Sequence, residues 1–184
     1  MKYTFHHVLI NFLIEGTFLK KKVKNIKFSD ENNHFKLLDN KIILEKSDEN
    51  INEFETLCFA PRDIEKVLIP STIKFIGSYA FYKCYENKAI EIEENSQLEI
   101  IGIRAFYFSS IESIKIPKHV SYIKDSAFAS YHDLKSIEFD ENSELLSIGK
   151  NSLIFSAIEK ITIPRKTSIY SNAFKFCEKL EEVK

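Results

Sequence analysis

Ile111-Glu112-Ser113-Ile114-Lys115-Ile116-Pro117 is the stretch that decides the fold, because versions of it recur at a fixed offset in both directions. Moving on 47 residues gives Ile158-Glu159-Lys160-Ile161-Thr162-Ile163-Pro164. Moving back 47 residues gives Ile64-Glu65-Lys66-Val67-Leu68-Ile69-Pro70. Self-similarity at a fixed period is the sequence signature of a repeat architecture. Three copies in one register therefore predict a repeat protein.

Each 47-residue block contains two unequal coils, which are marked by pairs of apolar residues. The two members of each pair are separated by one residue, as expected for a strand with one buried face. No coil can bury its own apolar face, but the next coil can cover it. The pairs recur at spacings of 23, 24, 23 and 24 residues: Val67/Ile69, Ile90/Ile92, Ile114/Ile116, Ile137/Phe139 and Ile161/Ile163.

A second series between these pairs predicts the tight part of each coil. An isoleucine is followed five residues later by a large apolar residue, which has alanine or serine directly before it. A small residue beside a large one suits a place where backbones converge and one side chain fills the interior. In three coils the isoleucine precedes Gly77, Gly102 or Gly149, where a sharp turn would favour a residue that tolerates positive φ. The series is Ile76/Phe81, Ile101/Phe106, Ile123/Phe128, Ile148/Leu153 and Ile169/Phe174.

Together, Ile64–Pro70 and Ile76-Gly77-Ser78-Tyr79-Ala80-Phe81-Tyr82-Lys83-Cys84 resemble the BspA-like leucine-rich repeats. The resemblance covers Ile64 to Lys184 well and residues 26–61 loosely. The expected fold is a leucine-rich-repeat solenoid of about 23–24 residues per coil. Short parallel strands are expected on one face and short helical or turn segments on the other. Two departures concern packing: Asn87 stands where Leu134 and Leu180 stand, and Ser152-Leu153 replaces Ala-Phe.

Three segments are expected along the chain. Residues 1–22 form a partly ordered segment or an incomplete first repeat, 23–63 hold irregular repeats, and 64–184 hold regular ones. Val8–Ile14 resembles a short signal core, but Asn11 interrupts it and no small-x-small cleavage site follows, so an incomplete repeat is favoured over a cleaved signal. The chain stops inside what should be the next strand, which predicts either a fragment of a longer array or end-to-end association through an uncapped coil. The fragment is favoured.

Bulk composition argues against several classes of partner. The formal net charge of −1 gives no electrostatic reason to expect nucleic acid or an anionic membrane. No run approaches the roughly 20 apolar residues of a membrane-spanning helix, so no membrane insertion is expected. Three cysteines exclude a complete disulfide framework. Cys84 and Cys177 fill the same slot of equivalent turns and are interpreted as small buried hydrophobic residues.

No catalytic, cofactor or metal site is predicted. The five histidines share no metal-ligand spacing beyond an adjacent pair, whose side chains would diverge on a strand. A Gly-rich phosphate loop, a nucleophile elbow and a zinc pattern are all missing. The repeat distributes polar residues evenly, whereas an enzyme needs a converging constellation. A non-enzymatic binding scaffold is the prediction.

The candidate binding face consists of the residues between the buried members of each strand pair: Leu68, Glu91, Lys115, Glu138 and Thr162. Neighbouring members would lie about 4.8 Å apart on adjacent strands. They form either a solvated ladder of alternating charge or a stripe that faces a ligand. Several aromatic residues outside the repeat core form either an interaction hot spot or packing between coils: Tyr79, Tyr82, Tyr85, Tyr107, Phe108, Tyr122, Tyr131 and Tyr170.

The resemblance also implies a role. Members of this family are often surface or secreted proteins linked to adhesion, so the expected partner is a host or matrix protein. The alternative is a cytoplasmic scaffold or regulatory subunit that binds an intracellular protein. The lack of a convincing signal peptide fits the alternative slightly better.

Overall fold

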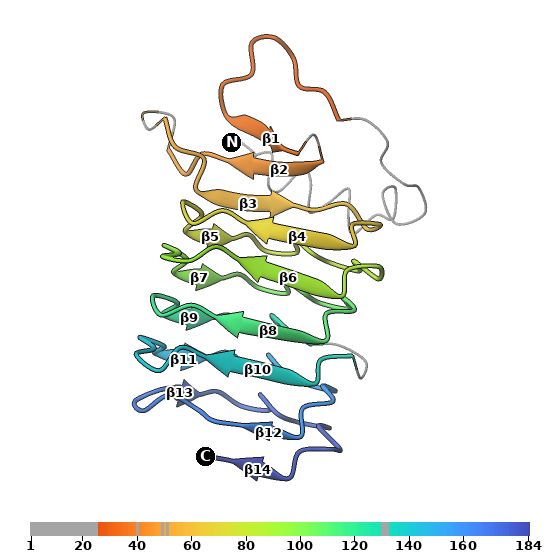
Figure 1. Ribbon diagram of the computed structural model, residues 1–184, viewed down its shortest axis with the longest axis vertical. Coiled ribbons are helices and arrows are strands. Elements are labelled where there is room, and N and C mark those ends of the chain that lie inside the picture. Colours follow the sequence, from red (N-terminus) through yellow and green to blue (C-terminus); the bar gives the residue numbers. More distant parts are fainter. Residues whose placement is uncertain (1–25, 40, 49, 51, 130–132) are drawn as a thin grey trace.

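The chain is an elongated stack of coils in the computed structural model, which describes residues 26–39, 41–48, 50, 52–129 and 133–184 (Figure 1). The segment expected at residues 1–22 lies outside this range. The described residues form fourteen strands, namely β1 (Phe35–Leu38), β2 (Ile42–Glu45), β3 (Thr56–Phe59), β4 (Lys66–Ile69), β5 (Phe75–Ile76), β6 (Ala89–Ile92), β7 (Ile100–Ile101), β8 (Ser113–Ile116), β9 (Tyr122–Ile123), β10 (Ser136–Phe139), β11 (Ser147–Ile148), β12 (Lys160–Ile161), β13 (Ser168–Ile169) and β14 (Glu182–Val183).

Each of the first four regular coils contributes one strand to a front sheet and one to a back sheet, and the fifth contributes β13 to the back sheet. The front sheet has the order β10-β8-β6-β4, and all its pairs are parallel. The back sheet has the order β1-β2-β3-β5-β7-β9-β11-β13. Figure 1 shows the two rows of strands stacked along the long axis. The predicted repeat solenoid is confirmed, and the second apolar series supplies a sheet of its own.

The first coils depart from the parallel pattern. Strands β1 and β2 form a hairpin around Asp39, because they pair antiparallel through four residues. Strand β3 then pairs antiparallel with β2 and parallel with β5. Asp39 has a φ of 51°, a turn conformation that Asp adopts more readily than most residues. The hairpin thus covers the first parallel strand of the back sheet.

The core is a set of columns that run along the axis. Phe81 stacks on Phe106 with ring centroids 4.9 Å apart, and Phe106 stacks on Phe128 at 5.1 Å. The alanines directly before these rings are fully buried, which lets the coil backbones approach one another. Leu153 continues the column in the next coil and is also buried. The predicted Ala-Phe ladder is the interior of the solenoid.

The segments after the back-sheet strands are turns, and none of the described residues is helical. In the first of them, Ala80 N–H donates to Gly77 C=O within its own coil, while Phe81 N–H donates to Ala105 C=O in the next coil. This alternation leaves no continuous i→i−4 ladder, so of the two expected alternatives, helical or turn segments, the chain adopts tight turns. The turns carry positive φ at two repeated positions, at Tyr79, Arg104, Ser126, Asn151 and Asn172 and then at Lys83, Phe108, Phe155 and Phe176.

Glycine has a different role from the predicted one. The backbone of Gly102 and Gly149 is not left-handed; positive φ falls two residues later, at Arg104 and Asn151. A Cβ at residue 102 would lie 2.7 Å from the Ile76 carbonyl oxygen of the preceding coil. These two glycines are therefore required by close backbone contact between coils and not by turn conformation.

Proline weakens every second junction of the front sheet. Glu93 N–H donates to Ile69 C=O at 3.0 Å, and Asp140 N–H donates to Ile116 C=O at 3.1 Å. Pro117 and Pro164 occupy the equivalent position in the other coils and have no N–H. Accordingly, β4–β6 and β8–β10 pair through four residues each, β6–β8 pairs through one, and β12 pairs with β14 in a separate sheet. The 47-residue period is thus visible as alternating strong and weak junctions.

Candidate functional site

The structure brings four of the five predicted face residues together. Leu68 lies opposite Glu91 in the β4–β6 register, and Lys115 lies opposite Glu138 in the β8–β10 register. All four side chains are exposed, and Leu68 retains 52% of its accessible surface. Thr162 is also exposed but follows β12, outside the front sheet. The expected continuous row of five strands is therefore interrupted after Glu138, and the cause is the weak junction at Pro164.

The charges of this row are not paired with one another. Among the residues that the structure describes, no salt bridge involves Glu91, Lys115 or Glu138. Ion pairs form elsewhere between coils, as between Lys135 and Glu112 at 2.6 Å. The alternating row is therefore a set of solvated charges on a fixed sheet, available to groups outside the chain.

Two open grooves border the row, each at a proline-weakened junction. The first has a volume of about 770 Å³ and is lined by Leu68, Glu91 and Lys115 and by Lys118 and His119. The second, of about 880 Å³, lies between β10 and the segment after β12 and contains both Glu138 and Thr162. Lys118 and His119 were missed in the sequence reasoning. Their position directly after Pro117, at the corner of the coil, is the signal that could have indicated them.

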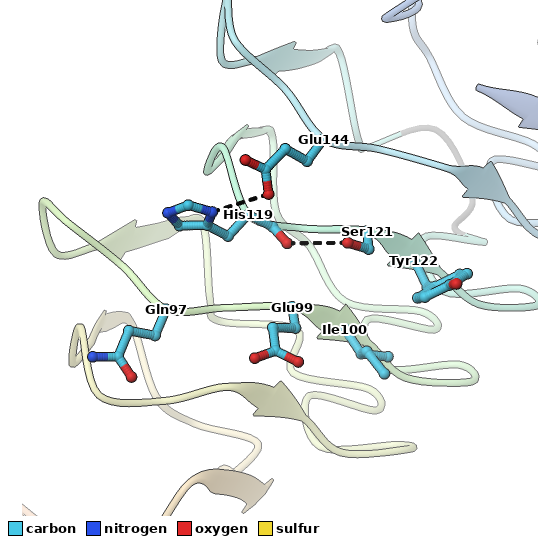
Figure 2. A pocket seen from close by; sticks show the side chains of 7 residues that line it. All are labelled: Gln97, Glu99, Ile100, His119, Ser121, Tyr122 and Glu144. Atoms are coloured by element: carbon cyan, nitrogen blue, oxygen red, sulfur yellow. Dashed lines mark hydrogen bonds and ion pairs between the residues drawn. The ribbon is translucent and has the colours of Figure 1, made fainter. Parts of the chain in front are cut away.

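A smaller pocket of about 370 Å³ lies on the neighbouring corner (Figure 2). There the His119 imidazole contacts a Glu144 carboxylate oxygen at 3.1 Å, and this hydrogen bond lowers the pKa of Glu144. Ser121 Oγ donates to the His119 backbone carbonyl at 3.4 Å and not to the imidazole. This serine therefore lacks the base contact that activates a nucleophile. His119 and Glu144 are both about half exposed.

The two cysteines that share a repeat position, Cys84 and Cys177, serve packing. Cys84 is fully buried, its Sγ contacts the Pro61 carbonyl at 3.4 Å, and burial raises its pKa to about 12. Cys84 Sγ also lies 3.8 Å from the Ala60 carbonyl, and Cys177 makes the equivalent contact, 3.1 Å to the Leu153 carbonyl, but is only half-buried. The prediction that both cysteines fill the same position of equivalent turns is confirmed. The prediction that they are buried is confirmed for Cys84 alone. A thiol with a raised pKa is a poor nucleophile at neutral pH.

The described residues contain no group of three or more His, Cys, Asp or Glu side chains placed to hold a metal ion. They also contain no helix with the length and apolar character needed to cross a bilayer.

Comparison with family models decides the classification. The model described as the BspA type leucine rich repeat region matches residues 40–181 in six copies. The chain belongs to the BspA-type leucine-rich repeat family. The resemblance read from the repeats is therefore confirmed. Comparison with curated proteins gave no match.

Two solved structures share this leucine-rich repeat fold. The pneumococcal vaccine antigen PcpA is 31% identical, with a TM-score of 0.56, over 65% of this chain and 29% of that protein. The leucine-rich repeat protein of T. pallidum is 19% identical, with a TM-score of 0.61, over 86% of this chain and 71% of that protein. The second likeness concerns the fold alone. The chain thus spans less than a third of the pneumococcal antigen.

Proposed function

We propose that the chain is a non-enzymatic, protein-binding solenoid that recognises its partner through the front sheet. The observation that carries this proposal is the row Leu68, Glu91, Lys115 and Glu138. It places an exposed apolar side chain beside three solvated charges on adjacent strands. Protein interfaces combine an apolar centre with charged groups that set orientation and specificity.

The rigidity of the sheet supports the same proposal. The backbones of Leu68 and Glu91 lie in a four-residue register, and those of Lys115 and Glu138 lie in another. A surface that is already ordered loses little conformational entropy on binding. The grooves beside the row offer space for partner side chains, and the first of them reaches from Leu68 to Lys115.

Adhesion at the cell surface is the physiological role that we propose. It rests on membership of the BspA-type family and on the likeness to a pneumococcal vaccine antigen. An intracellular scaffold would use the same row with a different partner. Labelling of intact source cells with an impermeant reagent separates the two roles: labelled protein supports adhesion, and protection from the reagent supports the scaffold.

Binding is tested with the full chain against immobilised fibronectin, collagen and laminin by surface plasmon resonance. We expect saturable binding to at least one of them, weakened about tenfold by Leu68→Thr or Lys115→Glu. Lys179→Glu makes the same charge change at an exposed site in the last coil and should leave binding unchanged. Equal binding by all three variants would assign the interaction to another surface.

A further inference from the structure

The solenoid carries a second distinctive surface, formed by its turn segments. We call the turn segments 78–83, 103–108, 125–129, 150–155 and 171–176 the turn ridge. Its aromatic side chains follow one another along the axis. Tyr82 stacks on Tyr107 with centroids 5.9 Å apart, and Phe155 stacks on Phe176 at 4.9 Å. The rings remain accessible, and Phe176 is 50% exposed.

The turn conformation does not require these aromatic residues. Phe108, Phe155 and Phe176 have φ values of 58°, 62° and 59°, in the left-handed region where Gly and Asn are favoured. Asn151 and Asn172 show the expected choice at the other repeated left-handed position, with φ of 55° and 59°. Bulky residues in such conformations point to a role besides folding.

A cation is held in place on the ridge. Arg104 is exposed, and its guanidinium carbon lies 5.7 Å from the Tyr79 ring centroid and 5.5 Å from that of Tyr107. Its Nη1 donates to the Tyr79 hydroxyl at 2.6 Å. In the described part of the chain it forms no salt bridge with a carboxylate. An oriented guanidinium with unused donors matches a carboxylate in a bidentate geometry.

Beside Arg104 the ridge has a notch. Among the described residues, the third coil lines this notch with Ser126 and Ala129, between Tyr107 on one side and Phe155 on the other. The notch has a volume of about 200 Å³. A cavity of about 150 Å³ is enough to hold a benzene molecule. One large apolar side chain therefore fits beside the guanidinium.

The charge of the ridge defines the partner. Lys83, Arg104, Lys150 and Lys175 lie in its segments, against the single acid Asp125, although the whole chain has a net charge of −1. This excess of cations favours an acidic partner. Asp125 lies in the central coil of the ridge. A uniform polyanion laid along the ridge would place one of its own negative charges against this carboxylate, so such a partner is disfavoured. Tyr, Phe and Arg are also the residues enriched in protein interfaces.

We propose that the turn ridge is a second docking surface, which binds an acidic segment of a partner protein. A carboxylate of that segment pairs with Arg104, and an adjacent apolar side chain enters the notch. The ridge is separate from the front sheet, so this site goes beyond the function proposed above. If experiments exclude one surface as a binding site, the proposal for the other surface still stands.

The test is selection of a phage-displayed library of random 12-residue peptides on the immobilised full chain. We expect enrichment of sequences in which acidic residues flank an apolar one. The best peptide, made synthetically, should bind the wild type about tenfold more tightly than Arg104→Gln. Phe155→Asn should weaken binding similarly and still fold, because Asn accepts the left-handed conformation. Lys115→Gln, which removes a cation from the front sheet, should bind the peptide as the wild type does.

Three outcomes overturn the proposal. The first is selection without enrichment of acidic peptides. The second is an acidic peptide that binds Arg104→Gln as tightly as the wild type. The third is Arg104-dependent binding of heparin or oligo(dT) in the absence of any selected peptide, which would identify a polyanion as the partner. Circular dichroism of each variant separates loss of binding from loss of fold.

Discussion

Asn87 and Leu134 occupy the same interior position in coils that lie 47 residues apart, and both are shielded from solvent. Leu134 belongs to the apolar core cluster. Asn87 presents an amide nitrogen and an amide oxygen, and neither has a hydrogen-bond partner among the residues that the structure describes. A buried polar group without a partner loses its hydration and gains nothing in return. The repeat thus contains a local energetic defect at one identifiable coil.

Replacing Asn87 by Leu should therefore stabilise the solenoid. We expect the free energy of unfolding to rise by about 1–3 kcal/mol, the usual penalty of an unsatisfied buried polar group. Urea denaturation followed by circular dichroism measures the change. The reverse substitution, Leu134→Asn, should destabilise by a similar amount. A less stable Asn87→Leu protein would show that the amide has a partner in solution, such as a bound water.

Ser152 is a second defect of the same kind. Its hydroxyl is buried and has no hydrogen-bond partner among the described residues, at a position that Ala80, Ala105 and Ala127 hold in other coils. Ser152→Ala should raise the melting temperature, with an increase in the free energy of unfolding of about 1 kcal/mol. Ser109 provides a matched control, because its buried Oγ donates to the Phe106 carbonyl at 2.9 Å. Ser109→Ala should not stabilise, and equal gains from both substitutions would contradict the explanation.

Gly102 should tolerate no side chain. A Cβ there would lie 2.7 Å from the Ile76 carbonyl oxygen and 2.8 Å from the Ser78 nitrogen, both backbone atoms. Gly102→Ala should therefore lower the free energy of unfolding by about 1–3 kcal/mol, the usual range for overpacking. Thermal denaturation measures it. Asn151→Gly, at a position with φ of 55°, should be nearly neutral. A neutral Gly102→Ala would mean that the coils separate without cost.

Glu55 should make stability depend on acid. Its side chain is buried, pairs with Lys74 and accepts a hydrogen bond from Ser47 Oγ at 2.7 Å, and these contacts lower its pKa. A carboxyl with a lowered folded-state pKa stabilises above its unfolded pKa, which is about 4.3, and the contribution is lost as pH falls through the folded value. The stability difference between wild type and Glu55→Gln should be present at pH 7 and shrink toward pH 2. A difference independent of pH would exclude the ion pair as its cause.

The sequence predicted the columns of the fold well, because strict recurrence fixes which residues stack. The pairs around Val67, Ile90, Ile114 and Ile137 all lie on the expected strands. The turn segments were harder, since a short Ala-Phe segment suits a helix or a tight turn equally. Only the bonds between coils distinguish the two. These bonds join residues about 24 positions apart and leave no local pattern.

The candidate face was predictable in part for the same reason. Alternation showed which side chains point outward, so Leu68 and Glu138 are exposed as expected. The front sheet breaks before Thr162 because Pro164 has no N–H to donate to the preceding coil. This effect becomes evident only when Pro164 is compared with Asp140, whose N–H makes that hydrogen bond in the neighbouring coil. Arg104 was missed because it replaces Tyr79 in the repeat and does not belong to the aromatic series. Its significance depends on the two rings that lie beside it.

Hydrogen–deuterium exchange of the full chain, with and without a saturating matrix protein identified by surface plasmon resonance, tests the front sheet most directly. We predict slower exchange in β4, β6 and β8 and at the Lys118–His119 corner on binding, and we expect Lys115→Glu to abolish this protection. Protection confined to other surfaces, or unchanged by Lys115→Glu, would contradict the assignment of the front sheet as the recognition surface.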